Sequence, residues 1–297
     1  MKLKPLILEN PFDEVKIPER WTWTYSSVRQ FRKCKRKFFW KYIMRLRPRF
    51  RDAALAIGSA FHDAVAEWYG SKRSSMAKIA ERYVEKLEAE FAENNEAYDQ
   101  KEYDKFEGGI QALMGMLCGY ADVYSEDRKK WPIDKDLIEA EFCIDMDDFD
   151  FAGKIDLVVP GKKPFIVEHK TAAKIGDSYV DRLPMDTQVR AYIFGAQYGL
   201  DIKVRKVLYD VIRKPSIRRK SNETQADYNK RLADDYMARP GFYFFREPLI
   251  FNMADVNSFE YELMQTHTEF NDILERCRKG HHDPLDPREW GINDAIC

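Results

Sequence analysis

A block of three short strands in the middle of the chain constrains the fold most strongly. Apolar and polar residues alternate along 137–146, 151–160 and 165–172, and polar turns separate the three runs. This period of two predicts β-strands, because alternate side chains of a strand lie on opposite faces of a sheet. In the third run Glu168 and Lys170 interrupt an apolar strand. Their spacing predicts that both charged groups lie on one face of the sheet.

Helical and strand-like segments alternate after this block. A helix over about 184–199 precedes a strand over 204–214, and a strand-like run over 241–251 precedes a helix over about 253–279. Segment 216–238 is polar, and we assign no element to it. Strands that alternate with helices predict an α/β fold, with helices on the faces of a sheet.

The chain before residue 136 is mainly helical. Apolar residues recur at three- and four-residue spacing along 28–46, 53–70, 74–97 and 101–130, whereas three prolines mark the first 20 residues as extended. These patterns divide the chain into four regions. They are an extended arm (1–20), a helical lobe (21–135), a core (136–212), and a C-terminal strand and helices that pack on the core (213–297).

Charge is unevenly distributed along the chain. The 49 basic residues nearly balance the 50 acidic ones, yet eleven Lys or Arg and no acid lie between Trp21 and Arg51. No stretch approaches the roughly 18 consecutive apolar residues of a membrane span, and the N-terminus lacks the pattern of a secretory signal. Five scattered cysteines without a CxxC pair argue against a disulfide framework and a zinc ribbon. We therefore expect an intracellular, cytoplasmic protein with no membrane partner.

The charged strand indicates a chemical site. If Asp156 lies on the neighbouring strand of a hairpin, two carboxylates and the amine of Lys170 converge. Burial of such charges is unfavourable unless they are paired. Hard oxygen ligands for Mg²⁺ beside a cation are what metal-assisted phosphodiester hydrolysis requires. An ordinary buried salt bridge is the alternative for so short a pattern.

Five ordered motifs resemble the PD-(D/E)XK nuclease superfamily, in particular its RecB-like exonuclease branch, which includes phage exonucleases and CRISPR-associated nucleases. The matches are the opening helix with Cys34 (26–47), Gly58-x-x-x-His62, Asp156, Glu168-x-Lys170-Thr171, and Gln188-x-x-x-Tyr192. The resemblance covers most of the chain. It implies a restriction-endonuclease-like core with a mixed β-sheet flanked by helices, together with the N-terminal helical lobe.

The resemblance also implies roles for single residues. It makes Asp156, Glu168, Lys170, Gln188 and Tyr192 catalytic. It assigns Mg²⁺ or Mn²⁺ to His62, Asp156, Glu168 and the backbone carbonyl of His169. Taken alone, His62 would be a core residue, and Gln188 and Tyr192 would be surface residues on one helix face. Glu141 is either an outer carboxylate for a second metal or a charge at a strand edge.

The basic stretch over 29–51 combines cations with aromatic rings. Lys and Arg neutralise phosphates regardless of sequence, and exposed rings stack on unpaired bases. We expect half of the rings to pack into the core instead. A second basic run over 213–220 is either a further DNA contact or a solvated loop. The cations assigned to DNA are Arg29, Arg32, Lys33, Lys35, Arg36, Lys37 and Lys41.

The cysteines depart from the family pattern. Many relatives hold a four-iron cluster with four thiolates. Here only Cys34 and Cys297 match the family positions, and Cys277 lies in the preceding helix. We therefore expect no iron–sulfur cluster and interpret Cys34 and Cys297 as remnants of those positions.

The motifs together predict a metal-dependent DNA exonuclease that acts at single-stranded or duplex ends, in DNA processing or recombination by a phage or mobile element. The sequence has no Walker-type phosphate loop, so no nucleotide cofactor is expected. Alternatives are a structure-selective endonuclease, a CRISPR-adaptation-like processing nuclease, and a non-catalytic DNA-binding module. The expected protein partner is a recombinase, a helicase or a single-strand-binding protein, and the expected location of a phage-encoded chain is the host cytosol.

Overall fold

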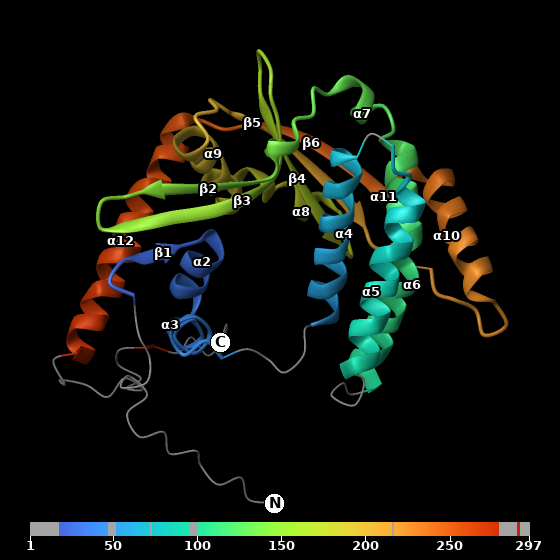
Figure 1. Ribbon diagram of the computed structural model, residues 1–297, viewed down its shortest axis with the longest axis horizontal. Helices are drawn as coiled ribbons and strands as arrows, with labels where there is room; N and C mark the ends of the chain where they lie inside the picture. The colour runs from blue at the N-terminus through green and yellow to red at the C-terminus, as the bar shows by residue number, and fades with distance from the viewer. Residues whose placement is uncertain are drawn as a thin grey trace, which may run out of the picture.

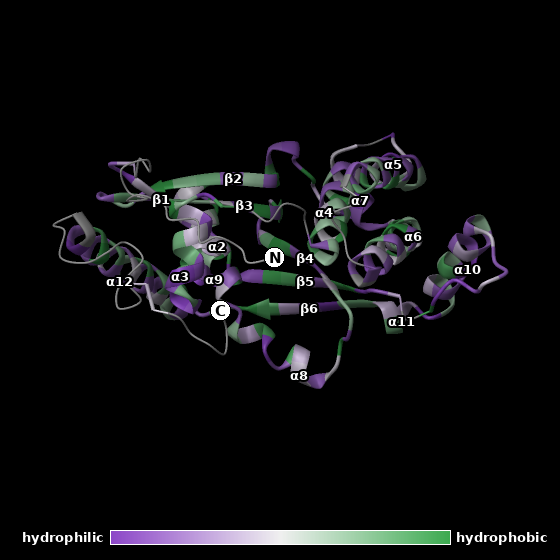
Figure 2. Ribbon diagram, turned by 90° about the horizontal axis from the view of Figure 1, so that it is seen from below, coloured by the Kyte–Doolittle hydropathy of each residue, from purple (hydrophilic) through white to green (hydrophobic). Residues whose placement is uncertain are grey.

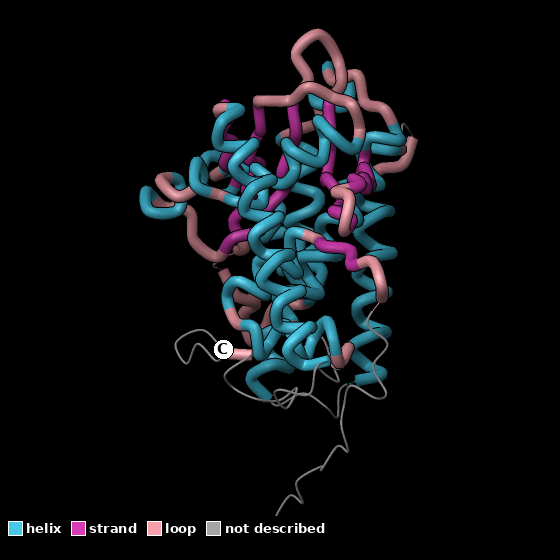
Figure 3. The backbone as a smooth tube through the Cα atoms, turned by 90° about the vertical axis from the view of Figure 1, so that its left-hand side faces the viewer, coloured by secondary structure: helices cyan, strands magenta, loops and turns pink. Residues whose placement is uncertain are grey.

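The computed structural model describes residues 18–46, 52–71, 73–94, 100–215, 217–278 and 290–291. Most of the expected arm, all of Cys297 and the side chain of Cys277 lie outside these residues. Figure 3 shows the strands gathered toward one end of the molecule, with the longer helices extending away from them. None of the helices in the described ranges is long and apolar enough to cross a membrane.

A mixed sheet of six strands forms the centre of the fold (Figure 1). The strands are β1 (Trp21–Trp23), β2 (Ile138–Asp145), β3 (Phe149–Val159), β4 (Phe165–Ala172), β5 (Lys206–Arg213) and β6 (Phe244–Ile250). β3 pairs antiparallel with β2 and β4, and β5 pairs antiparallel with β6. The pairs β1–β3 and β4–β5 are parallel. The predicted α/β fold with a mixed sheet flanked by helices is therefore confirmed.

Helices of very different length connect and cover the strands. They are α2 (Tyr25–Lys33), α3 (Lys35–Phe38), a π-helix (Phe39–Ile43), α4 (Ala53–Gly70), α5 (Met76–Asn94), α6 (Gln100–Val123), α7 (Asp127–Lys130), α8 (Asp177–Val180), α9 (Thr187–Gly199), α10 (Gln225–Ala238), α11 (Pro240–Tyr243) and α12 (Met253–Arg278), with short 3₁₀ turns at Lys135–Leu137 and Leu183–Met185. Aspartate residues cap the N-termini of α4 and α9. The carboxylates of Asp52 and Asp186 accept backbone N–H groups in the first turns of α4 and α9.

Two hydrophobic clusters cover opposite faces of the sheet. Ile166 belongs to the cluster that contains α2, α9 and α12, whereas its neighbour Val167 belongs to the cluster that contains α4, α5, α6 and α10. Adjacent strand residues point to opposite faces, so each cluster seals one face. Figure 2 shows α2, α3 and α12 on one side of the strands and α4, α5 and α6 on the other.

The basic segment is not the single continuous helix that its sequence predicts. The backbone of Cys34 is extended (φ −158°, ψ 103°) and separates α2 from α3. Its Sγ accepts the backbone N–H of Lys37 at 3.3 Å and so caps α3. The break lets the buried rings of Phe31 and Phe38 both pack on Phe270 of α12. Tertiary packing therefore overrides the local helical pattern.

Two further elements have no prediction from the sequence. β1 is only three residues long, and it exists because Trp21 and Trp23 pair with β3 and pack in the aromatic core. α10 lies in the polar segment, where Leu232 and Tyr236 are buried against α6. A β-carbon at Gly115 or Gly119 of α6 would overlap these two side chains, so both glycines permit the close approach.

Candidate active site

A gap in the pairing of β3 creates the site. β2 occupies one edge of β3 from residue 150 to residue 157, so β1 and β4 share the other edge. On that edge β1 pairs with 149–151 and β4 with 157–159, and the described strands leave 152–156 between them unpaired. Asp156 therefore lies where β3 and β4 separate. The backbone N–H of His169 on β4 donates to Oδ2 of Asp156 at 2.9 Å.

Asp156 is held as an anion by two donors. His62 of α4 places its Nδ1 3.3 Å from Oδ2 of Asp156. Burial raises the pKa of Asp156, but His62 and the backbone of His169 outweigh burial and hold the pKa at about 2. Burial lowers the pKa of His62, and the Asp156 carboxylate more than reverses this, so the pKa of His62 is raised. His62 of the helical lobe and Asp156 of the sheet thus form a charged pair at the site.

Glu168 is buried and incompletely paired. Its side chain is 1% exposed, and its Oε1 lies 2.5 Å from Nζ of Lys170. Its other oxygen, Oε2, is buried and accepts no hydrogen bond from the residues that the structure describes. Burial and the nearby Asp156 carboxylate raise the pKa of Glu168 to about 7, although Lys170 opposes them. A buried carboxylate oxygen without a partner is costly, and a bound cation would remove this cost.

Lys170 connects the sheet to α9 through a chain of polar groups. Its Nζ donates to Oε1 of Gln188 at 2.7 Å, and Nε2 of Gln188 donates to the hydroxyl of Tyr192 at 2.8 Å. Burial lowers the pKa of Lys170, but Glu168 more than compensates, so the pKa is raised. Burial also raises the pKa of Tyr192. At neutral pH these three side chains are therefore an ammonium, an amide and a neutral phenol.

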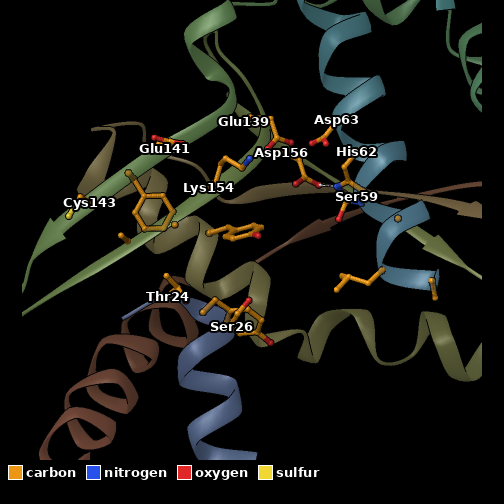
Figure 4. Close-up of a pocket in the computed structure, with 18 residues that line it drawn as sticks. Thr24, Ser26, Ser59, His62, Asp63, Glu139, Glu141, Cys143, Lys154 and Asp156 are labelled. Atoms are coloured by element: carbon orange, nitrogen blue, oxygen red, sulfur yellow. Dashed lines mark ion pairs between the residues drawn. The ribbon is translucent and has the colours of Figure 1, made fainter. Parts of the chain in front are cut away.

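An open cleft gives access to His62, Asp156 and Tyr192, which line it. It holds about 980 Å³ between α2, α4 and the β2–β3 hairpin. Figure 4 shows His62 and Asp156 directed toward each other, with Thr24 and Ser26 on the opposite wall. Glu141 lines the same cleft from β2 and is exposed. The cleft therefore presents the paired residues to solvent.

The residues present fit a hard divalent cation. Asp156 is an anion, Glu168 has an unpartnered buried oxygen, and His62 supplies a nitrogen beside them. Oxygen donors of this kind suit Mg²⁺, and an added imidazole also suits Mn²⁺. Among the described residues, no three His, Cys, Asp or Glu side chains form a metal site as they stand.

His169 points to the opposite face of β4 from Glu168 and Lys170 and forms a second His–Asp pair. Its Nδ1 lies 3.2 Å from Oδ2 of Asp210, and its ring stacks on Tyr69 of α4 at 6.0 Å. Asp210 is fully buried and also accepts from Tyr120 at 2.7 Å and from Arg246 at 2.8 Å. This network joins β4, β5 and β6 to the helical group that carries His62.

The sequence contained a signal for this second pair that we did not use. Asp210 interrupts the apolar strand 207–212 in the same way that Glu168 interrupts β4. Its partner Arg246 lies on β6, directly opposite in the register, and also forms an ion pair with Asp127 at 2.7 Å. These partners are far apart in the sequence, so only the sheet register reveals them.

The seven cations assigned to DNA fall into two groups. Three of them contact the protein itself: Arg32 pairs with Glu262 at 2.8 Å, Lys35 with Glu269 at 2.5 Å, and Arg36 donates to the carbonyl of Trp290 at 3.2 Å. The other four have exposed side chains, and the described residues include no ion-pair partner for them. These four are Arg29, Lys33, Lys37 and Lys41.

The aromatic rings of the same stretch are also divided. Phe31, Phe38 and Phe39 are fully buried, whereas Trp40 and Tyr42 are partly exposed. In the second basic run, Arg213 donates to the carbonyl of Ile175 at 2.7 Å. Cys34 is buried among the described residues. The remaining family-like cysteine side chains are not described, so the expected absence of a cluster stays a prediction.

Asp156 of the cleft lies near Glu168 and Lys170 on the adjacent strand, and carboxylates beside a cation are the arrangement of a metal-assisted nuclease. The PD-(D/E)XK nuclease superfamily model matches residues 22–290, and the chain belongs to this superfamily. A crystal structure named "Putative exonuclease" from Eubacterium rectale shares 11% identity with it, over 100% of this chain and 91% of that one, with a TM-score of 0.48. The structure of SSO0001 shares 14% identity over 72% and 84% of the two chains, with a TM-score of 0.26. None of the curated proteins compared with the chain matches it.

Proposed function

We propose that this chain is a divalent-metal-dependent deoxyribonuclease that hydrolyses phosphodiester bonds from DNA ends. The observation that carries this proposal concerns Glu168. One of its oxygens pairs with Lys170, and the other is buried near Asp156 with no hydrogen-bond partner in the described ranges. Membership of the nuclease superfamily supports the class of reaction. The open cleft supports a polymer substrate that enters from solvent.

Asp156, Glu168 and His62 are the residues that would hold Mg²⁺ or Mn²⁺, together with the backbone carbonyl of His169. When bound, such an ion supplies a Lewis acid for the phosphate and lowers the pKa of a bound water. The surrounding residues orient this set. The backbone N–H of His169 fixes Asp156, and the Gln188 amide fixes the ammonium of Lys170.

Lys170 acts in this proposal as a cation and not as a general base. Its pKa is raised by Glu168, so the ammonium keeps its proton at neutral pH. A fixed ammonium stabilises negative charge that develops on the phosphate, which is worth more in a buried site than in water. Tyr192 and Gln188 hold that ammonium in place and form the side of the site toward α9.

DNA ends would approach through the cleft between α2 and α4. The four exposed cations on α2, α3 and the π-helix, Arg29, Lys33, Lys37 and Lys41, would neutralise phosphates. Arg32, Lys35 and Arg36 would instead fix these helices to α12 and to Trp290. We place the origin of the chain with phage or mobile-element DNA processing, because the RecB-like motifs resemble that branch.

Cleavage of end-labelled linear DNA and of a closed circle of the same sequence tests the proposal. With Mg²⁺ or Mn²⁺, we expect the linear substrate to be shortened progressively and the circle to stay intact, and EDTA should stop the reaction. Cleavage of the circle would identify an endonuclease. Binding without cleavage under all metal conditions would identify a non-catalytic DNA-binding module.

A further inference from the structure

A second concave site lies at the far end of α9 from the cleft. It holds about 430 Å³ between the β3–β4 turn, the end of α9 and the segment that leads into β5. Gln188 contacts Lys170 at the start of α9, whereas Gln197 lines the second pocket. A helix that rises 1.5 Å per residue separates these two positions by about 13 Å. Figure 1 shows the β3–β4 turn pointing away from α2 and α4, which border the cleft.

Among the described residues that line this pocket, every charged side chain is positive. They are Lys162, Lys163, Lys203, Arg205 and Lys206. Lys206 lies over the ring of Phe165 at 5.1 Å, and the described part of the chain offers no ion-pair partner to the other four. The cleft, in contrast, is lined by Asp63, Glu139, Glu141 and Asp156. A nearly neutral chain has thus placed unpaired cations together in one hollow.

The interior of the pocket is apolar. Ile250 is 82% exposed at the end of β6, and Met253 lies beside it at the start of α12. An aliphatic side chain exposed to this extent beside unpaired cations matches a ligand that carries both negative charge and an apolar group. The described residues that line the pocket include no aromatic ring for base stacking, which single-stranded nucleic acid would favour.

We propose that this pocket binds an acidic peptide segment of a partner protein, with an apolar residue of that segment packed on Ile250 and Met253. Lys162, Lys163, Lys203 and Arg205 would pair with its carboxylates. Because the pocket lies away from the cleft, the partner could stay attached while DNA occupies the site. The inference depends on the charge and shape of this pocket and is independent of the proposed nuclease activity.

Fluorescence polarisation with a labelled peptide tests the proposal. The probe is four aspartates followed by leucine and phenylalanine, and a second probe replaces the last two residues with serines. We expect Lys203→Glu with Arg205→Glu to weaken binding of the first probe at least about tenfold, since it reverses two unpaired charges. Ile250→Ser should remove the preference for the apolar probe. The matched control is Lys129→Glu with Lys130→Glu, because both side chains are 70% exposed on α7.

Cleavage of naked DNA by the same variants separates this proposal from the nuclease proposal. We expect the Lys203/Arg205 variant to cleave at the rate of the unmodified protein and to lose only peptide binding. Equal binding by this variant and the α7 control would overturn the proposal, as would failure of the intact protein to bind the probe. Slower cleavage with displacement of the probe by a single-stranded oligonucleotide would also overturn it, and would assign the pocket to DNA.

Discussion

Two His–Asp pairs flank β4, with Asp156 on β3 and Asp210 on β5, and they differ in access and in partners. The ring centroids of His62 and His169 are 6.2 Å apart. The His62 and Asp156 side chains are 27% and 13% exposed, whereas those of His169 and Asp210 are 4% and 0% exposed.

Asp210 and Asp156 also differ in whether an arginine or lysine pairs with them. Arg246 pairs with Asp210 at 2.8 Å, whereas the described residues place no Lys or Arg in an ion pair with Asp156. The same two residue types therefore serve different purposes. A carboxylate sealed with a guanidinium holds elements together, and one that faces a cleft without it remains able to bind a ligand.

Breaking the buried ion pair between Arg246 and Asp210 should produce the largest loss of stability. Arg246→Met leaves the Asp210 charge buried without its cation, which typically costs about 3–5 kcal/mol. Urea unfolding measures this loss. Arg231→Met provides the matched control, because it breaks the more exposed pair with Glu223 on the outside of α10. The control should lose clearly less stability, because water screens a more exposed ion pair, and equal losses in both variants would show that Asp210 does not need Arg246.

The contribution of the buried Asp210 carboxylate to stability should depend on pH. Burial raises the pKa of Asp210, but Arg246 and His169 outweigh it, so the pKa is held below its usual range. A carboxylate with a lowered folded pKa stabilises the fold above its unfolded pKa of about 3.9, and this contribution is lost as pH falls toward the folded value. The urea concentration at the midpoint of unfolding should therefore decrease as the pH is lowered below about 4. Asp210→Asn should be less stable at pH 7 and less sensitive to acid, and a parallel pH profile would exclude this role.

Breaking the His62–Asp156 pair at the cleft should instead lower activity. His62→Ala removes a nitrogen donor beside Asp156 and should lower cleavage in Mg²⁺ by about tenfold or more, the scale for residues that orient metal ligands. Mn²⁺ should restore part of the rate, because it binds the remaining oxygen donors more tightly than Mg²⁺ does. Thermal unfolding serves as the control. A less stable variant with unchanged specific activity would make His62 a core residue.

The smallest effect concerns DNA affinity. Arg29→Ala, Lys33→Ala and Lys37→Ala together should lower the slope of log affinity against log salt by about 0.9 for each lost phosphate contact. The matched set replaces Arg32, Lys35 and Arg36, which contact the protein itself. Binding titrations at several salt concentrations compare the two sets. Identical slopes would show that exposure on these helices does not select the DNA contacts.

The sequence predicted the elements that local pattern alone determines. The helix expected over 53–70 is α4 (Ala53–Gly70), and alternation located β2, β3 and β4 within a few residues. The cap at Asp186 and the four-residue spacing of Gln188 and Tyr192 explain why that motif could be assigned to one helix.

The features that the sequence did not predict depend on distant contacts. β1 requires the free edge of β3, and the break at Cys34 requires Phe270 from the other end of the chain. The candidate site could be assembled residue by residue from motifs, but its gap could not. The pairing of β1 and β4 with separate parts of β3 leaves that gap, and no local pattern reports it.

We predict that the ammonium of Lys170, which pairs with Glu168 where β3 and β4 separate, is required for phosphodiester hydrolysis. Lys170→Met tests it most directly, with end-labelled linear DNA in Mg²⁺ and with DNA affinity and thermal unfolding measured alongside. We predict at least about a hundredfold loss of cleavage, the scale for removing a fixed electrostatic group. DNA affinity should stay close to that of the unmodified protein, because phosphate contacts elsewhere provide it. Cleavage by the Lys170 variant at a near-normal rate would contradict the claim.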